Sequence, residues 1–89
     1  MRSFTQSSFW DAYHALPDHI KTQANRAYTL FQANPDHPSL NFKRVGRRNP
    51  VYSVRISAGY RALGVMSQND IIWFWVGPHH EYDRLLRRS

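Results

Sequence analysis

The stretch from Pro50 to Asp83 constrains the fold more than any other part of this sequence. Residues 51–57 alternate between polar and apolar side chains, which is typical of a strand covered on one face. Residues 60–66 follow after a short turn, and residues 71–76 (IIWFWV) are apolar throughout, as in a strand covered on both faces. We therefore predict three consecutive strands joined by hairpins.

The segment before these strands carries the periodicity of helices. Pro17 separates residues 9–16 from residues 18–33, and in both segments apolar side chains recur at helical spacing. A connection this short predicts a helical hairpin, whose second helix ends near Asn34 because Pro35 follows. The other expected elements are two short strands and a short helix, at residues 1–5, at residues 39–45 and from His80 onward.

Helices followed by hairpin-linked strands are typical of an α+β fold. We predict a single domain over residues 1–89, in which the helical hairpin packs on a mostly antiparallel sheet of about four strands. The hairpin should cover one face of the sheet and leave the other partly open. We expect Phe4 to point inward, and Trp73 and Trp75 to lie in the core on one face of their strand.

The charge of the chain predicts an anionic partner. Twelve Lys and Arg stand against six Asp and Glu, a formal net charge of +6, and ten of the twelve are the arginine that suits phosphate best. The alternative is a basic surface that only aids solubility. The absence of cysteine excludes disulfides and thiolate zinc sites and fits a cytoplasmic protein. No apolar run reaches the ~20 residues of a membrane span, so no membrane partner is expected.

Two cations lie inside predicted strands, Arg55 and Arg61, and a titratable cluster follows the last strand. Cleavage of RNA needs a base for the 2′-hydroxyl, cations for the phosphate and an acid for the leaving oxygen. Histidine titrates near neutral pH, and arginine binds phosphate through two parallel hydrogen bonds. If the anionic partner is RNA, the candidate catalytic residues are Arg61, His79, His80, Glu81 and Tyr82.

Each of these residues also has a structural interpretation. The two histidines follow Gly-Pro and fit an ordinary loop, and Glu81 fits the start of a helix because of the helix dipole. Tyr82 fits packing under the sheet, and Arg55 fits an ion pair with Asp83 or with Asp11. The remaining histidines, His14, His19 and His37, lie too far apart in the sequence to indicate a metal site.

The whole pattern resembles the RelE/ParE superfamily, the toxin components of type II toxin–antitoxin systems. The resemblance covers nearly the whole chain and implies a RelE-like α+β fold. Its signals, in order, are two N-terminal helices, Asn34-Pro35, Ser39-Leu40, a Lys43-Arg44 strand, VYSVRISAGYRALG at 51–64 and WFWVGPHHEYD at 73–83.

The resemblance also implies an activity and partners. It implies an endoribonuclease that cleaves ribosome-bound mRNA without a metal or other cofactor, with Arg61, one of the two histidines and Tyr82 in the site. It further implies an acidic antitoxin as protein partner. The alternatives are an inhibitor of DNA gyrase that works by binding, and a non-catalytic basic binding protein. The expected RNA-binding residues are Lys43, Arg44, Arg47, Arg48 and Arg55.

Overall fold

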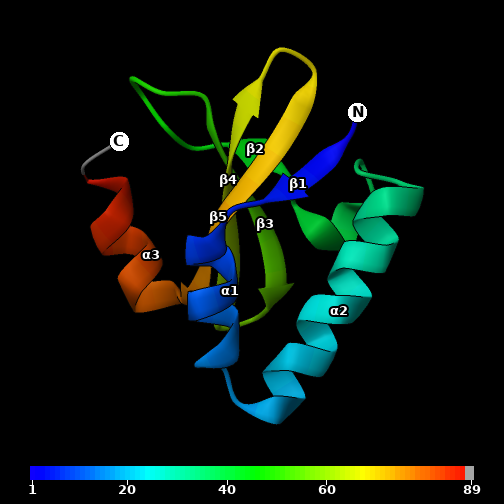
Figure 1. Ribbon diagram of the computed structural model, residues 1–89, viewed down its shortest axis with the longest axis vertical. Coiled ribbons are helices and arrows are strands. Elements are labelled where there is room, and N and C mark those ends of the chain that lie inside the picture. The colour runs from blue at the N-terminus through cyan, green and yellow to red at the C-terminus, as the bar shows by residue number, and fades with distance from the viewer. Residues whose placement is uncertain (88–89) are drawn as a thin grey trace.

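The computed structural model describes residues 1–87 of the chain (Figure 1), so the last two residues of the predicted domain lie outside the described residues. A short 3₁₀ helix, Pro38–Leu40, precedes the second strand. The other elements, in chain order, are β1 (Ser3–Thr5), α1 (Ser7–His14), α2 (Asp18–Ala33), β2 (Lys43–Arg44), β3 (Val51–Ser57), β4 (Tyr60–Ser67), β5 (Asp70–Pro78) and α3 (His79–Leu86).

The strands form one five-stranded sheet in the order β1-β5-β4-β3-β2. Strands β2 to β5 are antiparallel, whereas β1 runs parallel to β5 at the edge of the sheet. The predicted α+β class is confirmed, and each of the five segments expected as strands contributes to the sheet, for which about four strands were predicted. The strand expected at residues 39–45 is reduced to β2, because the 3₁₀ helix and the left-handed Asn41 (φ 46°) occupy its first part.

The two N-terminal helices cover one face of the sheet but follow different strands. Helix α1 lies over β5, and α2 lies over β3, so that the helices diverge from the turn that joins them (Figure 1). Helix α2 buries Ile20, Ala24, Ala27 and Phe31, as its sequence period predicts, whereas Tyr28, also expected in this apolar stripe, remains exposed. No helix described between residues 1 and 87 has the length and apolar character of a membrane span.

The sheet separates two apolar clusters. The larger one lies under α1 and α2 and contains Val54 and Trp73, while the smaller one lies under α3 and contains Leu63, packed against Trp75. The expectation that Trp73 and Trp75 share a face is therefore wrong. A register shift between Leu63 and Gly64 inserts an extra residue in β5 and turns the two indoles to opposite faces.

The side chain of Phe4 does not point inward as expected. It is 46% exposed, because β1 is an edge strand of three residues that has a neighbour on one side only. The guanidinium of Arg2 lies 5.4 Å from the centre of its ring. The first strand is thus correctly placed by the sequence, but its largest side chain remains on the surface.

Candidate functional site

The strand register gathers three cations on the face of the sheet that carries α3. Arg55 on β3 lies directly opposite Arg61 on β4, and Lys43 on β2 lies opposite Ser53, two residues before Arg55. Directly opposed residues have Cβ atoms about 5 Å apart, and like charges in that position repel each other. We call Lys43, Arg55 and Arg61 the cationic face.

The cationic face lacks acidic partners in the described part of the chain. No carboxylate of residues 1–87 lies within ion-pair distance of Lys43, Arg55 or Arg61. The pairing of Arg55 with Asp83 or Asp11, which the sequence leaves open, is therefore not found. Three cations without a counter-charge attract an anion from solution, and arginine is a side chain that can bind phosphate through two parallel hydrogen bonds.

Arg61 also has a local structural role. Its side chain is partly buried, and Nη1 donates to the carbonyl oxygens of Ser57 at 2.7 Å and Tyr60 at 2.9 Å. These bonds hold the turn between β3 and β4. A guanidinium has five N–H donors, and the two carbonyls are bound through a single nitrogen, so Arg61 can hold the turn and still contact an anion.

The start of α3 lies at the same end of the sheet. The backbone N–H of His79 donates to the carbonyl of Gly59 at 2.8 Å, which ties α3 to the turn that Arg61 holds. The His79 Nδ1 atom lies 3.4 Å from a carboxylate oxygen of Asp83. His80 is exposed and Glu81 is partly buried. Of the two candidate histidines, His79 is the one whose backbone is bound to the turn that Arg61 holds.

Tyr82 is part of the core and not of the surface. It is 7% exposed and packs in the cluster of Val51 and Leu63, and its hydroxyl donates to Ser53 Oγ at 3.5 Å. The buried Tyr82 side chain therefore anchors α3 on the sheet. Its catalytic role, like that of the other residues in the candidate cluster, stays a prediction.

The other predicted RNA-binding residues do not converge on this site. Arg44 lies opposite Tyr52, on the face that α2 covers, and its Nε donates to the carbonyl of Gly46 at 3.1 Å. Arg47 and Arg48 are exposed in the loop before β3, at the end of that strand remote from Arg61. The start of β3 is four strand steps, roughly 13 Å, from Arg55, so these two arginines extend the positive surface beyond the candidate centre.

The histidines outside the cluster form no metal site in the part of the chain that the structure describes. Across residues 1–87, no three His, Asp or Glu side chains are arranged to hold a metal ion. His37 has a local role, because its Nδ1 accepts a hydrogen bond from the backbone N–H of Ser39 at 3.2 Å and so begins the 3₁₀ helix.

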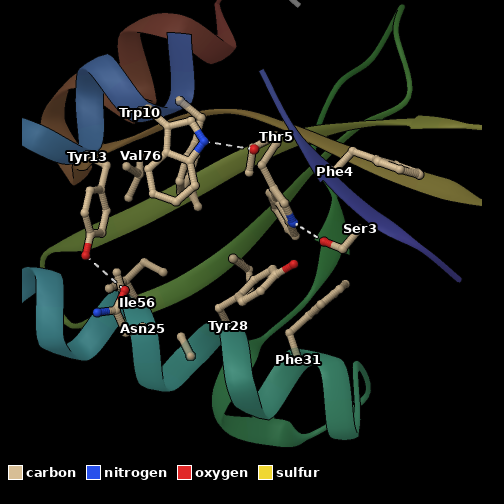
Figure 2. Close-up of a pocket in the computed structure, with 16 residues that line it drawn as sticks. Ser3, Phe4, Thr5, Trp10, Tyr13, Asn25, Tyr28, Phe31, Ile56 and Val76 are labelled. Carbon is tan, nitrogen blue, oxygen red and sulfur yellow. Dashed lines mark hydrogen bonds between the residues drawn. The ribbon is translucent and has the colours of Figure 1, made fainter. Parts of the chain in front are cut away.

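The opposite face carries a feature that sequence reasoning missed. Between α1 and α2 lies a groove of about 410 Å³ with an apolar lining (Figure 2). Two exposed aromatic side chains, Trp10 and Tyr28, belong to it, whereas the ring of Phe4 on β1 points away from it (Figure 2). We call it the aromatic groove. The concentration of aromatic residues before Phe31 is the sequence signal for it, but the signal alone is equally compatible with a closed core.

Comparison with solved structures identifies the fold as that of RelE-type toxins. The structure matches the RelB–RelE antitoxin–toxin complex from Methanococcus jannaschii with a TM-score of 0.73 and 18% identity over 91% of this chain and 96% of that one. It also matches the YoeB/ParE toxin from Agrobacterium tumefaciens (0.67, 16%, over 89% and 99%) and the isolated RelE toxin from Escherichia coli (0.63, 15%, over 98% and 96%).

The family follows from the sequence comparison. Residues 18–84 match the ParE-like toxin domain, which is most of the chain, and the protein therefore belongs to the RelE/ParE family of toxins from toxin–antitoxin systems. The resemblance seen in the sequence is confirmed. No curated protein sequence matches the chain significantly.

Proposed function

We propose that this toxin is an endoribonuclease that cleaves ribosome-bound mRNA in the cytoplasm, with the cationic face as its RNA-binding surface. One observation carries the proposal. Arg55 and Arg61 face each other across β3 and β4, without a carboxylate partner in residues 1–87, at the end of the sheet where His79 is tied down. A pair of opposed arginines beside a histidine suits a phosphodiester.

The proposed reaction uses the side chains of the chain and no cofactor. A base removes the proton of the 2′-hydroxyl, the 2′-oxygen bonds to phosphorus, and the 5′-oxygen leaves with a proton from an acid. Arg55 and Arg61 neutralise the charge that develops on the phosphate. His79 serves as acid or base, and His80 or Glu81, beside it on α3, supplies the second proton-transfer group.

The positive surface around this centre would hold the rest of the substrate. Lys43 lies on the same face as the arginine pair and is placed for a neighbouring phosphate. Arg47 and Arg48 lie beyond the start of β3, which is roughly 13 Å from Arg55, a distance that suits ribosomal RNA or a more distant part of the mRNA. Contacts of this kind give affinity without base specificity.

Primer extension on cellular mRNAs after brief induction tests the proposal. We expect new ends at defined codon positions, reduced about tenfold or more in Arg55→Ala, because a hydrogen bond to a charged group contributes about 1.5–3 kcal/mol. The matched control is Arg2→Ala, which removes an exposed arginine paired with Asp70 at the end of β5 remote from Arg61. Unchanged cleavage in Arg55→Ala, or equal loss in the control, would refute the assignment.

Binding to DNA gyrase without chemistry is the second candidate. Two candidate catalytic residues have structural roles that favour this alternative. Tyr82 is buried in the core, and Arg61 holds the turn between β3 and β4. A supercoiling assay run beside primer extension separates the two. Inhibited supercoiling with intact mRNA, and growth arrest that survives Arg55→Ala with His79→Ala, would replace the nuclease by the gyrase inhibitor.

We also propose that an acidic antitoxin binds this toxin. The M. jannaschii structure of the same fold is a complex of RelE with its antitoxin RelB. The present chain carries a net charge of +6, which favours a partner of opposite charge.

A further inference from the structure

A second cleft lies at the edge of the sheet, between α2, the 3₁₀ helix and β3. It has a volume of about 450 Å³. Four polar residues line it, Gln23, Arg26, Ser39 and Arg55, and the rest of its lining is apolar. We call it the edge cleft. It combines two arginines with an apolar surface, which is unlike both the aromatic groove and the cationic face.

The spacing of residues along α2 explains where the edge cleft lies. Gln23, Arg26 and Leu30 follow one another at i, i+3 and i+7, so they share one side of the helix and all line the edge cleft. Asn25 and Tyr28 lie on another side of the helix and line the aromatic groove instead. Arg26 therefore points toward the edge of β3, away from α1.

Arg55 connects the edge cleft with the cationic face. Strand β2 pairs with β3 only at Tyr52 and Ser53, so among residues 1–87 no strand covers the edge of β3 beyond Ser53. The Arg55 side chain is exposed at this open edge. It lines the edge cleft, and its register opposite Arg61 also makes it part of the cationic face. One anionic chain can therefore contact both sites by passing around the edge of β3.

The charge and lining of the edge cleft suit a nucleotide. None of its lining residues is acidic, and no carboxylate of residues 1–87 lies within ion-pair distance of Arg26 or Arg55. Two cations from different elements around one cleft attract an anion. Proteins that bind single-stranded nucleic acid combine such a positive groove with surfaces on which bases stack, and the plane of an arginine is one of these surfaces.

We propose that the edge cleft binds a second nucleotide of the single-stranded RNA whose cleaved bond lies on the cationic face. Arg26 binds the phosphate of this nucleotide, and Gln23 and Ser39 offer an amide and a hydroxyl to its base. Arg55 lies between the two nucleotides. The inference rests on the proposed nuclease function and adds the path of the substrate, which runs from the cationic face around the open edge of β3 to α2.

Binding of a single-stranded RNA of about eight nucleotides to the full chain, followed by fluorescence anisotropy, tests the edge cleft. Methylation of every 2′-oxygen prevents cleavage, so the assay measures binding alone. In Arg26→Gln the affinity should fall about threefold or more, the size of one exposed charged contact. The slope of log affinity against log salt should also decrease by about 0.7, which is the loss of one phosphate contact to a single strand.

The matched control is Lys21→Gln. It removes the same charge from the side of α2 where the Lys21 ammonium lies 5.9 Å from the ring centre of Tyr13, in the aromatic groove. Its affinity should change by less than about 1.5-fold, and its salt slope should stay that of the wild type. Circular dichroism shows whether each variant is folded.

A second pair of variants tests the edge cleft without removing an arginine. Gln23→Glu adds a carboxylate to the lining beside Arg26 and should lower the affinity as Arg26→Gln does. Gln32→Glu is the same substitution nine residues later, about half a turn around the helix, and should leave the affinity nearly unchanged.

Four outcomes would overturn the proposal. They are no binding of the RNA by the wild type, unchanged affinity in Arg26→Gln, an equal loss in Lys21→Gln, and an octaglutamate peptide that binds as tightly as the RNA and is weakened as much by Arg26→Gln. The last outcome would make the edge cleft a site for an acidic protein. The nuclease is tested separately, because primer extension with Arg55→Ala reports cleavage. Cleavage with unchanged RNA affinity in Arg26→Gln would refute only the edge cleft, whereas Arg26-dependent binding without cleavage would refute only the nuclease.

Discussion

Replacing Tyr82 distinguishes an anchor of α3 from a catalytic acid. Removing the ring in Tyr82→Ala should cost about 3–5 kcal/mol, the usual range for a buried aromatic side chain. An 89-residue domain has a total stability of about 4–13 kcal/mol at ~0.05–0.15 kcal/mol per residue, so this loss is a large share. Tyr82→Phe keeps the packing and removes one hydrogen bond. At 3.5 Å that bond is long, and we expect its loss to cost under about 1 kcal/mol.

Urea unfolding followed by tryptophan fluorescence measures these free energies of unfolding. The control is His80→Ala, an exposed position on the same helix, which should change the stability by less than about 0.5 kcal/mol. A cost below about 1 kcal/mol for Tyr82→Ala would refute the anchoring role of the ring. A cost above about 2 kcal/mol for Tyr82→Phe would show that the hydrogen bond to Ser53 is stronger than its length indicates.

The same variants decide the catalytic question. Tyr82→Phe retains the packed ring and lacks the phenolic proton. If Tyr82 only anchors α3, Tyr82→Phe should cleave mRNA as the wild type does. Loss of cleavage at unchanged stability would instead support the predicted role of Tyr82 as a proton donor.

Two further predictions concern the sheet and its edge. Gly64→Ala should destabilise the protein by about 1–3 kcal/mol in urea unfolding, because its Cβ would lie 2.8 Å from the Trp73 ring and 2.9 Å from Ile71. The control is Gly59→Ala, whose Cβ would have no atom within 4 Å, and its stability should be nearly unchanged or slightly raised. The Arg2 side chain donates to Asp70 and holds the pKa of that carboxyl below its usual range, so the interaction stabilises the fold above the ordinary pKa of about 3.9 and is lost as the pH falls through the lowered value. The stability difference between the wild type and Arg2→Ala should therefore be constant above about pH 5 and disappear in acid, and a difference that persists in acid would refute this pairing.

Periodicity predicted the fold where one pattern dominates. Residues 18–33 and 51–57 form a helix and a strand with the predicted bounds, because their apolar residues repeat at a single spacing. The strand at residues 39–45 was overestimated, since local hydrogen bonding around His37 favours a 3₁₀ helix there. The bulge in β5 could not be seen in IIWFWV, because an uninterrupted apolar run looks the same with or without an inserted residue.

In the candidate site, too, the sequence predicted the residue types but not the packing around them. The sequence identified Arg55, Arg61 and His79, which the structure brings to one end of the sheet. The sequence could not show that Tyr82 is buried, because its burial depends on where α3 packs. Nor could it show that Arg44 lies on the face covered by α2, since a two-residue strand is too short for an alternating pattern of polar and apolar residues.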